Sequence, residues 1–463
     1  MPVSSDQVEE PPNQLVDTND DATDKWSRDV WLLLAARFVR MTAFGSSSLI
    51  LALFLSALGQ TPVQVGRFLT LTLAGDFLLS LVLTFVADSL LGRRNTLRLG
   101  ALSMLISGLV FATTTNVNSL LAAAIFDVTS PSGGELGPFR TVEESILAAL
   151  VEKRHRPGLF GWYVVTGAFA ASLATWLGGL MNELVDADEG EELVAYYRWV
   201  FVVYSVMGLV KLLLSLSLSQ RCEASTRSAN PPASTRSQGQ TEANEREPLL
   251  PAPVPNVQQP EEPGFSHSRF ALLCTLFAID SLGSGMASQT LTSWYLSRKF
   301  NASLGTILSA LLISATSNLF SARIAHHLGL VTTMELTHLP ANIFLTLIPL
   351  PFSLHLTSAL IVARAATSSM DQAPRAAFLS AFVPEDRRTR VLGLVGTVQT
   401  VAQAVGPGLT GWFAGVGRMG WAFQVAGVLK GGYDLGFTSL QLPNLYLSRL
   451  CTKASTNQHV GCF

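Results

Sequence analysis

The chain has 463 residues, of which 48% are hydrophobic and 14% are charged, and its net charge is −2 at pH 7. Soluble globular proteins carry about 25% charged residues, and the shortfall here comes from long apolar runs that are typical of membrane-spanning helices. The near-neutral charge gives no indication of a nucleic-acid partner, and the four scattered cysteines lack the spacing of a metal or redox site.

The N-terminal stretch, residues 1–28, is acidic and polar and contains prolines, so we expect a disordered cytosolic tail. It lacks the basic start and early apolar core of a secretory signal peptide. Six apolar segments follow and predict an N-terminal six-helix bundle over residues 29–218. The predicted spans cover about residues 31–58, 65–90, 96–115, 120–150, 159–184 and 194–218.

Residues 219–266 change character, because Ser, Thr, Pro, Gln and Glu dominate and no apolar face can form. This composition predicts a disordered cytosolic linker. Within it, Glu245-Arg246-Glu247-Pro248-Leu249-Leu250 resembles an acidic dileucine sorting signal, which a sorting adaptor would read at Glu245, Leu249 and Leu250. The pattern is short and often arises by chance, so a linker without a sorting role is the alternative.

The apolar pattern then restarts and predicts a C-terminal six-helix bundle over residues 267–440, followed by a cytosolic tail at 441–463. The last span is the least regular, because Lys430, Asp434 and Pro443 interrupt its apolar run. The six predicted spans cover about residues 270–296, 304–325, 333–354, 357–382, 391–416 and 420–440.

Short motifs recur between the two halves at a nearly constant offset. Phe44-Gly45-Ser46 resembles Leu282-Gly283-Ser284, and Phe54-Leu55-Ser56 resembles Tyr295-Leu296-Ser297, within an offset of about 232–241 residues. Random apolar repeats would not keep one offset, so we expect two related halves around one central site.

The basic residues indicate the orientation in the membrane. With a cytosolic N-terminus, ten arginines and lysines at predicted helix ends face the cytosol and five face the other side, so we expect the linker and both termini in the cytosol. Asn301-Ala302-Ser303 is a glycosylation sequon on the outer side, but it lies so close to the membrane that an unglycosylated Asn301 is the alternative.

Two segments place an acidic residue three positions before a proline within an apolar run: Glu135-Leu136-Gly137-Pro138 and, 236 residues later, Asp371-Gln372-Ala373-Pro374. Charges at membrane depth are costly and indicate function by default. A carboxylate in a low dielectric holds its proton more tightly, so either acid could bind a proton or a cationic part of a substrate. The alternative is structural, because Asp371 with Arg375 and Arg140 with Glu144 have the i, i+4 spacing of neutralising pairs.

Further charges lie within the predicted spans. Arg37 and Arg40 could contact an anionic substrate or extend to lipid phosphates, and either could pair with Asp280 across the two halves. The full set of candidate substrate- or proton-binding residues is Glu135, Asp371, Arg140, Arg375, Arg37, Arg40, Asp76, Asp127 and Asp280.

Twelve spans in two related halves, with the turn Ala87-Asp88-Ser89-Leu90-Leu91-Gly92-Arg93-Arg94 between the second and third spans, resemble the major facilitator superfamily. Thr84 stands where that family usually has glycine, and one extra residue separates Asp88 from Gly92. The resemblance implies an all-α membrane protein of twelve transmembrane helices in two pseudo-symmetric six-helix bundles. It also implies a cytosolic gate formed by Asp88, Gly92, Arg93 and Arg94, for which the alternative is arginines that only set topology.

Three segments are most similar to a fungal branch of that superfamily. They are Thr337-His338-Leu339-Pro340, Met370-Asp371-Gln372-Ala373-Pro374-Arg375 and Gly406-Pro407-Gly408. Antiporters of the superfamily carry a Gly-Pro motif in their fifth span, whereas here the Gly-Pro pair lies in the eleventh. This difference argues against drug–proton antiport.

The expected function is secondary active transport of a small solute by alternating access, coupled to protons. The alternatives are a non-transporting nutrient sensor with the same fold and a facilitated-diffusion uniporter. Neither an ATP-binding Gly-x-x-x-x-Gly-Lys-Ser/Thr loop nor a Gly-x-Ser-x-Gly nucleophile motif in a suitable setting is found, so we expect no enzyme activity, no catalytic residue, no metal and no cofactor. We expect a monomer in the lipid bilayer of the plasma membrane or of a vacuolar or endosomal membrane.

Overall fold

The computed structural model describes residues 26–86, 91–126, 138–152, 155–184, 191–223, 267–300, 330–368 and 388–436, and almost all of them are helical. The apolar runs of the sequence explain this, because a backbone in hydrocarbon must satisfy its own hydrogen bonds and a helix does so within one segment. The prediction of an all-α protein is confirmed.

The helices of the first half begin and end within a few residues of the predicted spans. The fourth predicted span forms two helices, α4 and α5, on either side of residues 127–137, which lie outside the described residues. The helices are α1 (Arg28–Ala57), α2 (Pro62–Val86), α3 (Arg93–Thr113), α4 (Val117–Phe126), α5 (Pro138–Leu150), α6 (Arg156–Leu184) and α7 (Glu191–Leu216), followed by the short 3-10 helix η2 (Gln220–Cys222).

The second half contains α8 (His267–Met286), α9 (Gln289–Phe300), α11 (Leu330–Leu347), α12 (Leu354–Ser368), α14 (Arg388–Gly415) and a last helix over residues 419–436. α8 and α9 are separated by a short break and bent by 42° relative to each other, and by length and hydropathy the pair could make one span. At the bend, the backbone carbonyl of Met286 accepts a hydrogen bond of 2.8 Å from Thr410 Oγ1 of α14. The predicted span at 304–325 lies outside the described residues.

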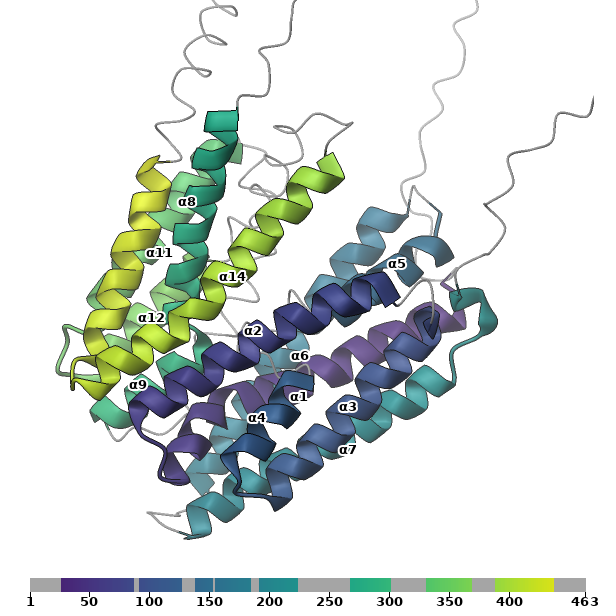
Figure 1. Ribbon diagram of the computed structural model, residues 1–463, viewed down its shortest axis with the longest axis horizontal. Coiled ribbons are helices and arrows are strands. Elements are labelled where there is room, and N and C mark those ends of the chain that lie inside the picture. Colours follow the sequence, from purple (N-terminus) through teal and green to yellow (C-terminus); the bar gives the residue numbers. More distant parts are fainter. Residues whose placement is uncertain are drawn as a thin grey trace, which may run out of the picture.

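The helices run between two ends of the molecule. The linker end holds the start of α1, η2 and the start of α8; the loop end holds the turns at 58–61, 114–116, 348–353 and 416–418. Figure 1 shows α8, α9, α11, α12 and α14 gathered on one side, with α2 of the first half running beside α14.

Close contacts between the halves lie at the loop end. Gly66 of α2 approaches the backbone of Pro407 and Gly411 in α14 so closely that an added Cβ would lie 2.7 Å from Gly411 Cα. Ser293 of α9 donates a hydrogen bond of 2.8 Å to the carbonyl of Leu49 in α1. One apolar core cluster combines residues 49–55 of the first half with residues 286–296 of the second. The two halves are therefore closed against each other at this end.

The outer helix faces are apolar. By length and hydropathy alone, four of the described helices could cross a membrane, or five if the bent pair α8–α9 is counted as one span. Monomeric soluble proteins seldom expose large apolar surfaces, so these faces indicate contact with lipid. Large exposed apolar side chains on them include Leu78, Val82, Ile106, Leu109, Trp162, Phe169, Trp199, Leu213 and Val428.

Candidate functional site

Among the described residues, each half buries a cluster of polar side chains between its helices. The arginine cluster of the first half comprises Arg37, Arg40, Glu143, Tyr163 and Lys211. The histidine cluster of the second half comprises Asp280, Ser284, His338, Asn342, Lys430 and Asp434.

Glu143 of α5 is the centre of the arginine cluster. Its Oε2 accepts hydrogen bonds from Arg40 Nη2 at 2.8 Å and from the hydroxyl of Tyr163 at 2.6 Å. Its Oε1 lies 3.7 Å from Lys211 Nζ. Because α1, α5, α6 and α7 each contribute one of these side chains, the pairs fix how the four helices sit against one another.

Arg37 lies one helical turn before Arg40 on α1, so both point to the same face. Its guanidinium lies over the ring of Tyr163, with Cζ 4.5 Å from the ring centre. Gly167 of α6 leaves room for it, because an added Cβ there would lie 2.7 Å from Arg37 Nε. Arg37 is 2% exposed, and neither its Nε nor its Nη1 has a hydrogen-bond acceptor among the described residues.

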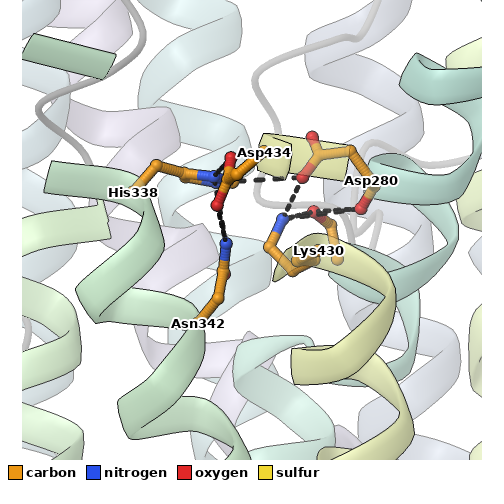
Figure 2. A network of polar contacts seen from close by, with 6 residues as sticks. Asp280, His338, Asn342, Lys430 and Asp434 are labelled. Atoms are coloured by element: carbon orange, nitrogen blue, oxygen red, sulfur yellow. Dashed lines mark hydrogen bonds and ion pairs between the residues drawn. The ribbon is translucent and has the colours of Figure 1, made fainter. Parts of the chain in front are cut away.

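The histidine cluster joins three helices (Figure 2). His338 Nδ1 lies 2.6 Å from Asp434 Oδ1, and Asn342 Nδ2 donates to Asp434 Oδ2 at 2.8 Å. On the other side of the ring, His338 Nε2 lies 3.8 Å from Asp280 Oδ1. An imidazole therefore stands between two buried carboxylates.

Lys430 holds the second of these carboxylates. Its Nζ donates to Asp280 Oδ1 at 2.6 Å and to Ser284 Oγ at 2.8 Å. Lys430 and Asp434 are four residues apart on the last helix, as are His338 and Asn342 on α11, so each pair lies on one helix face. The i, i+4 spacing thus brings two polar faces together against α8.

Nδ1 of His338 is close to two groups, Asp434 Oδ1 at 2.6 Å and Asn342 Nδ2 at 3.0 Å. A carboxylate can only accept a hydrogen bond, so the tautomer that carries its proton on Nδ1 donates to Asp434 and leaves Nε2 toward Asp280. A second proton taken up by His338 would therefore sit on Nε2, 3.8 Å from Asp280 Oδ1.

The structure brings several of the predicted site residues into these clusters. Arg37 and Arg40 belong to the arginine cluster, and Asp280 belongs to the histidine cluster. Asp76 is buried on α2. The predicted pair of Arg140 with Glu144 is confirmed, with 2.6 Å between Arg140 Nε and Glu144 Oε1.

The predicted pair of Arg37 or Arg40 with Asp280 is wrong in this conformation. Arg40 is paired with Glu143 of its own half, and Asp280 is paired with Lys430 of its own half. Arg40 and Asp280 therefore each find a partner inside their own group of helices.

Several predicted residues lie outside the described residues: Glu135, Asp127, Asp371, Arg375, Asp88, Glu245, Leu249, Leu250 and Asn301. The described part of the predicted gate is the start of α3. Gly92 has a φ of 77°, a left-handed conformation that favours glycine, and the backbone N–H of Arg94 donates to Glu223 Oε2 at 3.4 Å.

Sequence reasoning did not assign a site role to most of the cluster residues. In the sequence, Lys430 and Asp434 appear as interruptions of an apolar run, and the pattern around Lys211 indicates no role for it. The signal was available, because a lysine or a histidine within an apolar span is costly and marks function by default. The residues without an assigned role are Glu143, Tyr163, Lys211, Ser284, His338, Asn342, Lys430 and Asp434.

The end of the first half is tied to its beginning. Asp29 of α1 accepts hydrogen bonds from the backbone N–H of Ser219 at 3.0 Å and from its hydroxyl at 2.5 Å. Cys222 follows in η2 and is a buried free thiol. Within the described ranges, no group of three or more His, Cys, Asp and Glu side chains is arranged to hold a metal ion.

Comparison with solved structures identifies the architecture. A bacterial homologue of the iron transporter ferroportin, in an inward-facing state, has a TM-score of 0.67 at 12% identity, covering 90% of this chain and 99% of that one. The nucleoside transporter NupG has a TM-score of 0.62 at 12% identity, with coverages of 90% and 100%. The xylose transporter XylE from E. coli, in an inward-open conformation, has a TM-score of 0.63 at 13% identity, with coverages of 88% and 95%.

Sequence comparison is more direct. An uncharacterized membrane protein of Saccharomyces cerevisiae (strain ATCC 204508 / S288c) is 32% identical over 421 residues, which cover 88% of this chain and 93% of that protein. The profile of the Major Facilitator Superfamily matches residues 33–363 and 273–433. The chain is therefore an integral, multi-pass membrane protein that belongs to the Major Facilitator Superfamily.

Proposed function

We propose that this protein is a secondary transporter that couples the movement of a small solute to protons by alternating access. The family and fold support transport of a small solute across a membrane. Proton coupling goes further, and one observation carries it: His338 stands between the buried carboxylates of Asp280 and Asp434.

The contacts between the halves support alternating access. The halves are closed against each other at the loop end by α2 with α14 and by α1 with α9. With the linker end in the cytosol, as the distribution of basic residues predicts, this is the conformation closed to the outside. Rocking of one half on the other would open the loop end in the opposite state.

The charge of the histidine cluster changes with one proton. Asp280, Asp434 and Lys430 together carry −1 when His338 is neutral and zero when His338 is protonated. A buried cluster of zero net charge costs less than one of −1. Because its ring lies between two buried carboxylates, His338 is placed to take up a proton from one side and release it to the other.

Proton flux in proteoliposomes tests this proposal. Liposomes containing the full chain and a trapped pH-sensitive dye are offered neutral, acidic and basic solutes. We expect one solute class to carry protons with it in the wild type. His338→Gln should stop the proton movement, because an amide keeps a hydrogen bond but gains no charge. The matched control is His355→Gln, since His355 lies exposed on α12.

The other outcomes of the proteoliposome experiment distinguish the alternative functions. Solute movement without protons in the wild type indicates a uniporter with structural acids. No movement by a folded wild type favours a non-transporting sensor. If His338→Gln still moves protons with the solute, His338 is not the proton carrier. Glu135→Gln and Asp371→Asn are then the next variants to test.

A further inference from the structure

The arginine cluster buries a positive charge that its own carboxylate does not pair. Glu143 is shared by Arg40 and Lys211, at 2.8 and 3.7 Å. Arg37 makes no ion pair with any described residue, although it is 2% exposed. A guanidinium that is buried with no anion among the described residues is costly, so the described contacts alone do not explain why it is placed there.

The unused donors belong to both arginines. Nε and Nη1 of Arg37, and Nε and Nη1 of Arg40, are buried and have no hydrogen-bond acceptor among the described residues. A guanidinium carries one N–H on Nε and two on each Nη, so each arginine offers three such donors. Guanidinium groups bind carboxylate and phosphate oxygens with short, charge-assisted hydrogen bonds.

The guanidinium of Arg37 is held in place before any ligand arrives. Its Cζ lies 4.5 Å from the centre of the Tyr163 ring, and the hydroxyl of Tyr163 is fixed on Glu143 at 2.6 Å. Gly167 provides the space on the α6 side. A donor fixed in this way loses little conformational freedom when it binds.

We propose that the arginine cluster is an oxyanion subsite, in which Arg37 binds a carboxylate or phosphate group of the transported solute and Arg40 supplies further donors. This inference rests on the proposed transport function and adds the substrate class, an organic acid or a phosphorylated solute. Because Arg37 is buried in this conformation, an anion reaches it only after a local opening of the helices, so binding is best measured at equilibrium.

The experiment follows the thermal unfolding midpoint of the full chain in lipid nanodiscs. Sodium acetate, succinate, citrate, inorganic phosphate and glycerol phosphate are each titrated at constant ionic strength, with sodium chloride as the reference. We expect the carboxylates or the phosphates to raise the midpoint above the chloride reference. The arm that responds identifies which oxyanion the site takes.

Variants of Arg37 and a matched control test whether the response comes from the arginine cluster. Arg37→Gln should weaken the apparent affinity about tenfold or more, because a hydrogen bond to a charged group contributes that much. The matched control is Arg67→Gln, an exposed arginine on α2 that should leave the response unchanged. If Arg37→Gln does not fold, Arg37→Lys and Gly167→Ala replace it, since the first removes the planar fork and the second displaces the guanidinium.

Two results overturn the inference. The wild type could respond to every salt as it does to chloride, or Arg37→Gln could respond like the wild type. The first result is expected if a carboxylate of the chain itself fills the place in another conformation. Anion binding that depends on Arg37 without any transport refutes the proposed transport alone, and proton-coupled transport without such binding refutes the oxyanion subsite alone.

Discussion

At the scale of single residues, Glu143 decides the electrostatics of the first half. It is fully buried and compensates cations that come from α1 and α7. A buried pair contributes little net stability compared with an apolar replacement, but removing one partner leaves the other charges buried and uncompensated. Removing Glu143 should therefore destabilise the folded protein more than its ordinary ion-pair distances of 2.8 and 3.7 Å indicate.

Glu143→Gln should lower the free energy of unfolding by about 3–5 kcal/mol, because Arg40 and Lys211 stay buried without their carboxylate. The measurement is chemical unfolding in detergent micelles. Glu144→Gln is the control on the same helix: its pair with Arg140 is partly exposed, and such i, i+4 pairs contribute about 0.3–0.5 kcal/mol. Equal losses in both variants would contradict the buried-charge explanation.

The reactivity of the Cys222 thiol is a measure of the contact between α1 and η2. Burial raises the pKa of its thiol to about 11, and the carboxylate of Asp29 adds to this. Only the thiolate reacts, so maleimide labelling should be slow at neutral pH and should accelerate as the pH approaches 11. The stability that comes from the protonated thiol is complete below the ordinary thiol pKa and is lost as the pH rises through about 11.

Asp29→Asn should speed the labelling of Cys222 at a fixed pH, because it removes the charge that disfavours the thiolate. The measurement uses a variant in which Cys274, Cys451 and Cys462 are serine. A labelling rate that Asp29→Asn leaves unchanged, in a protein with an unchanged unfolding midpoint, would show that burial alone sets the reactivity.

The two clusters show which contacts can be predicted from the sequence and which cannot. The Arg140–Glu144 pair was predicted because i, i+4 spacing lies on one helix face. The pairs of Arg40 with Glu143 and of His338 with Asp434 join residues that are 103 and 96 positions apart. Periodicity indicates which face of a helix is polar, but it does not indicate which helix the face meets.

At the scale of elements, α2 and α14 form the closest contact between the halves at the loop end. Gly66, Pro407 and Gly411 bring the two backbones together there. The Gly-Pro pair of α14 was visible in the sequence, but the helix that it meets was not. The bounds of most helices were predicted to within a few residues, because the ends of apolar runs coincide with the ends of helices in a bilayer.

Gly66→Leu should lower the free energy of unfolding by about 1–3 kcal/mol, the usual effect of overpacking. The reason is that an added Cβ would meet the backbone of Gly411 at 2.7 Å and Pro407 O at 2.6 Å, and backbone cannot yield as a flexible side chain does. Gly161→Leu on α6 is the control, since an added Cβ there meets nothing within 4 Å. An equal effect of both substitutions on unfolding would contradict the steric argument.

At the scale of the whole molecule, a local proton equilibrium is expected to shift the arrangement of the two halves. The histidine cluster is buried in the conformation described here, and protonated His338 brings its charge to zero. If the cluster binds its proton in this conformation and releases it in the other, a higher proton concentration should favour the loop-closed conformation.

Spin labels at positions 61 and 418, both exposed at the loop end of different halves, measure this directly. In the wild type we expect a short distance at low pH and a broader, longer distribution at high pH. In His338→Gln the distribution should not change with pH. A wild-type distance distribution that does not change with pH would show that protonation of the histidine cluster does not control the motion of the halves.

The pairing of charges within each half also bears on how the protein is made. Glu143, Arg40 and Lys211 all precede residue 219, and Asp280, His338, Lys430 and Asp434 all follow residue 266. The Asp29–Ser219 contact closes the first half on itself. During synthesis the first half can therefore neutralise its buried carboxylate before the second half leaves the ribosome, so the two halves, expressed as separate polypeptides, should each insert and then assemble.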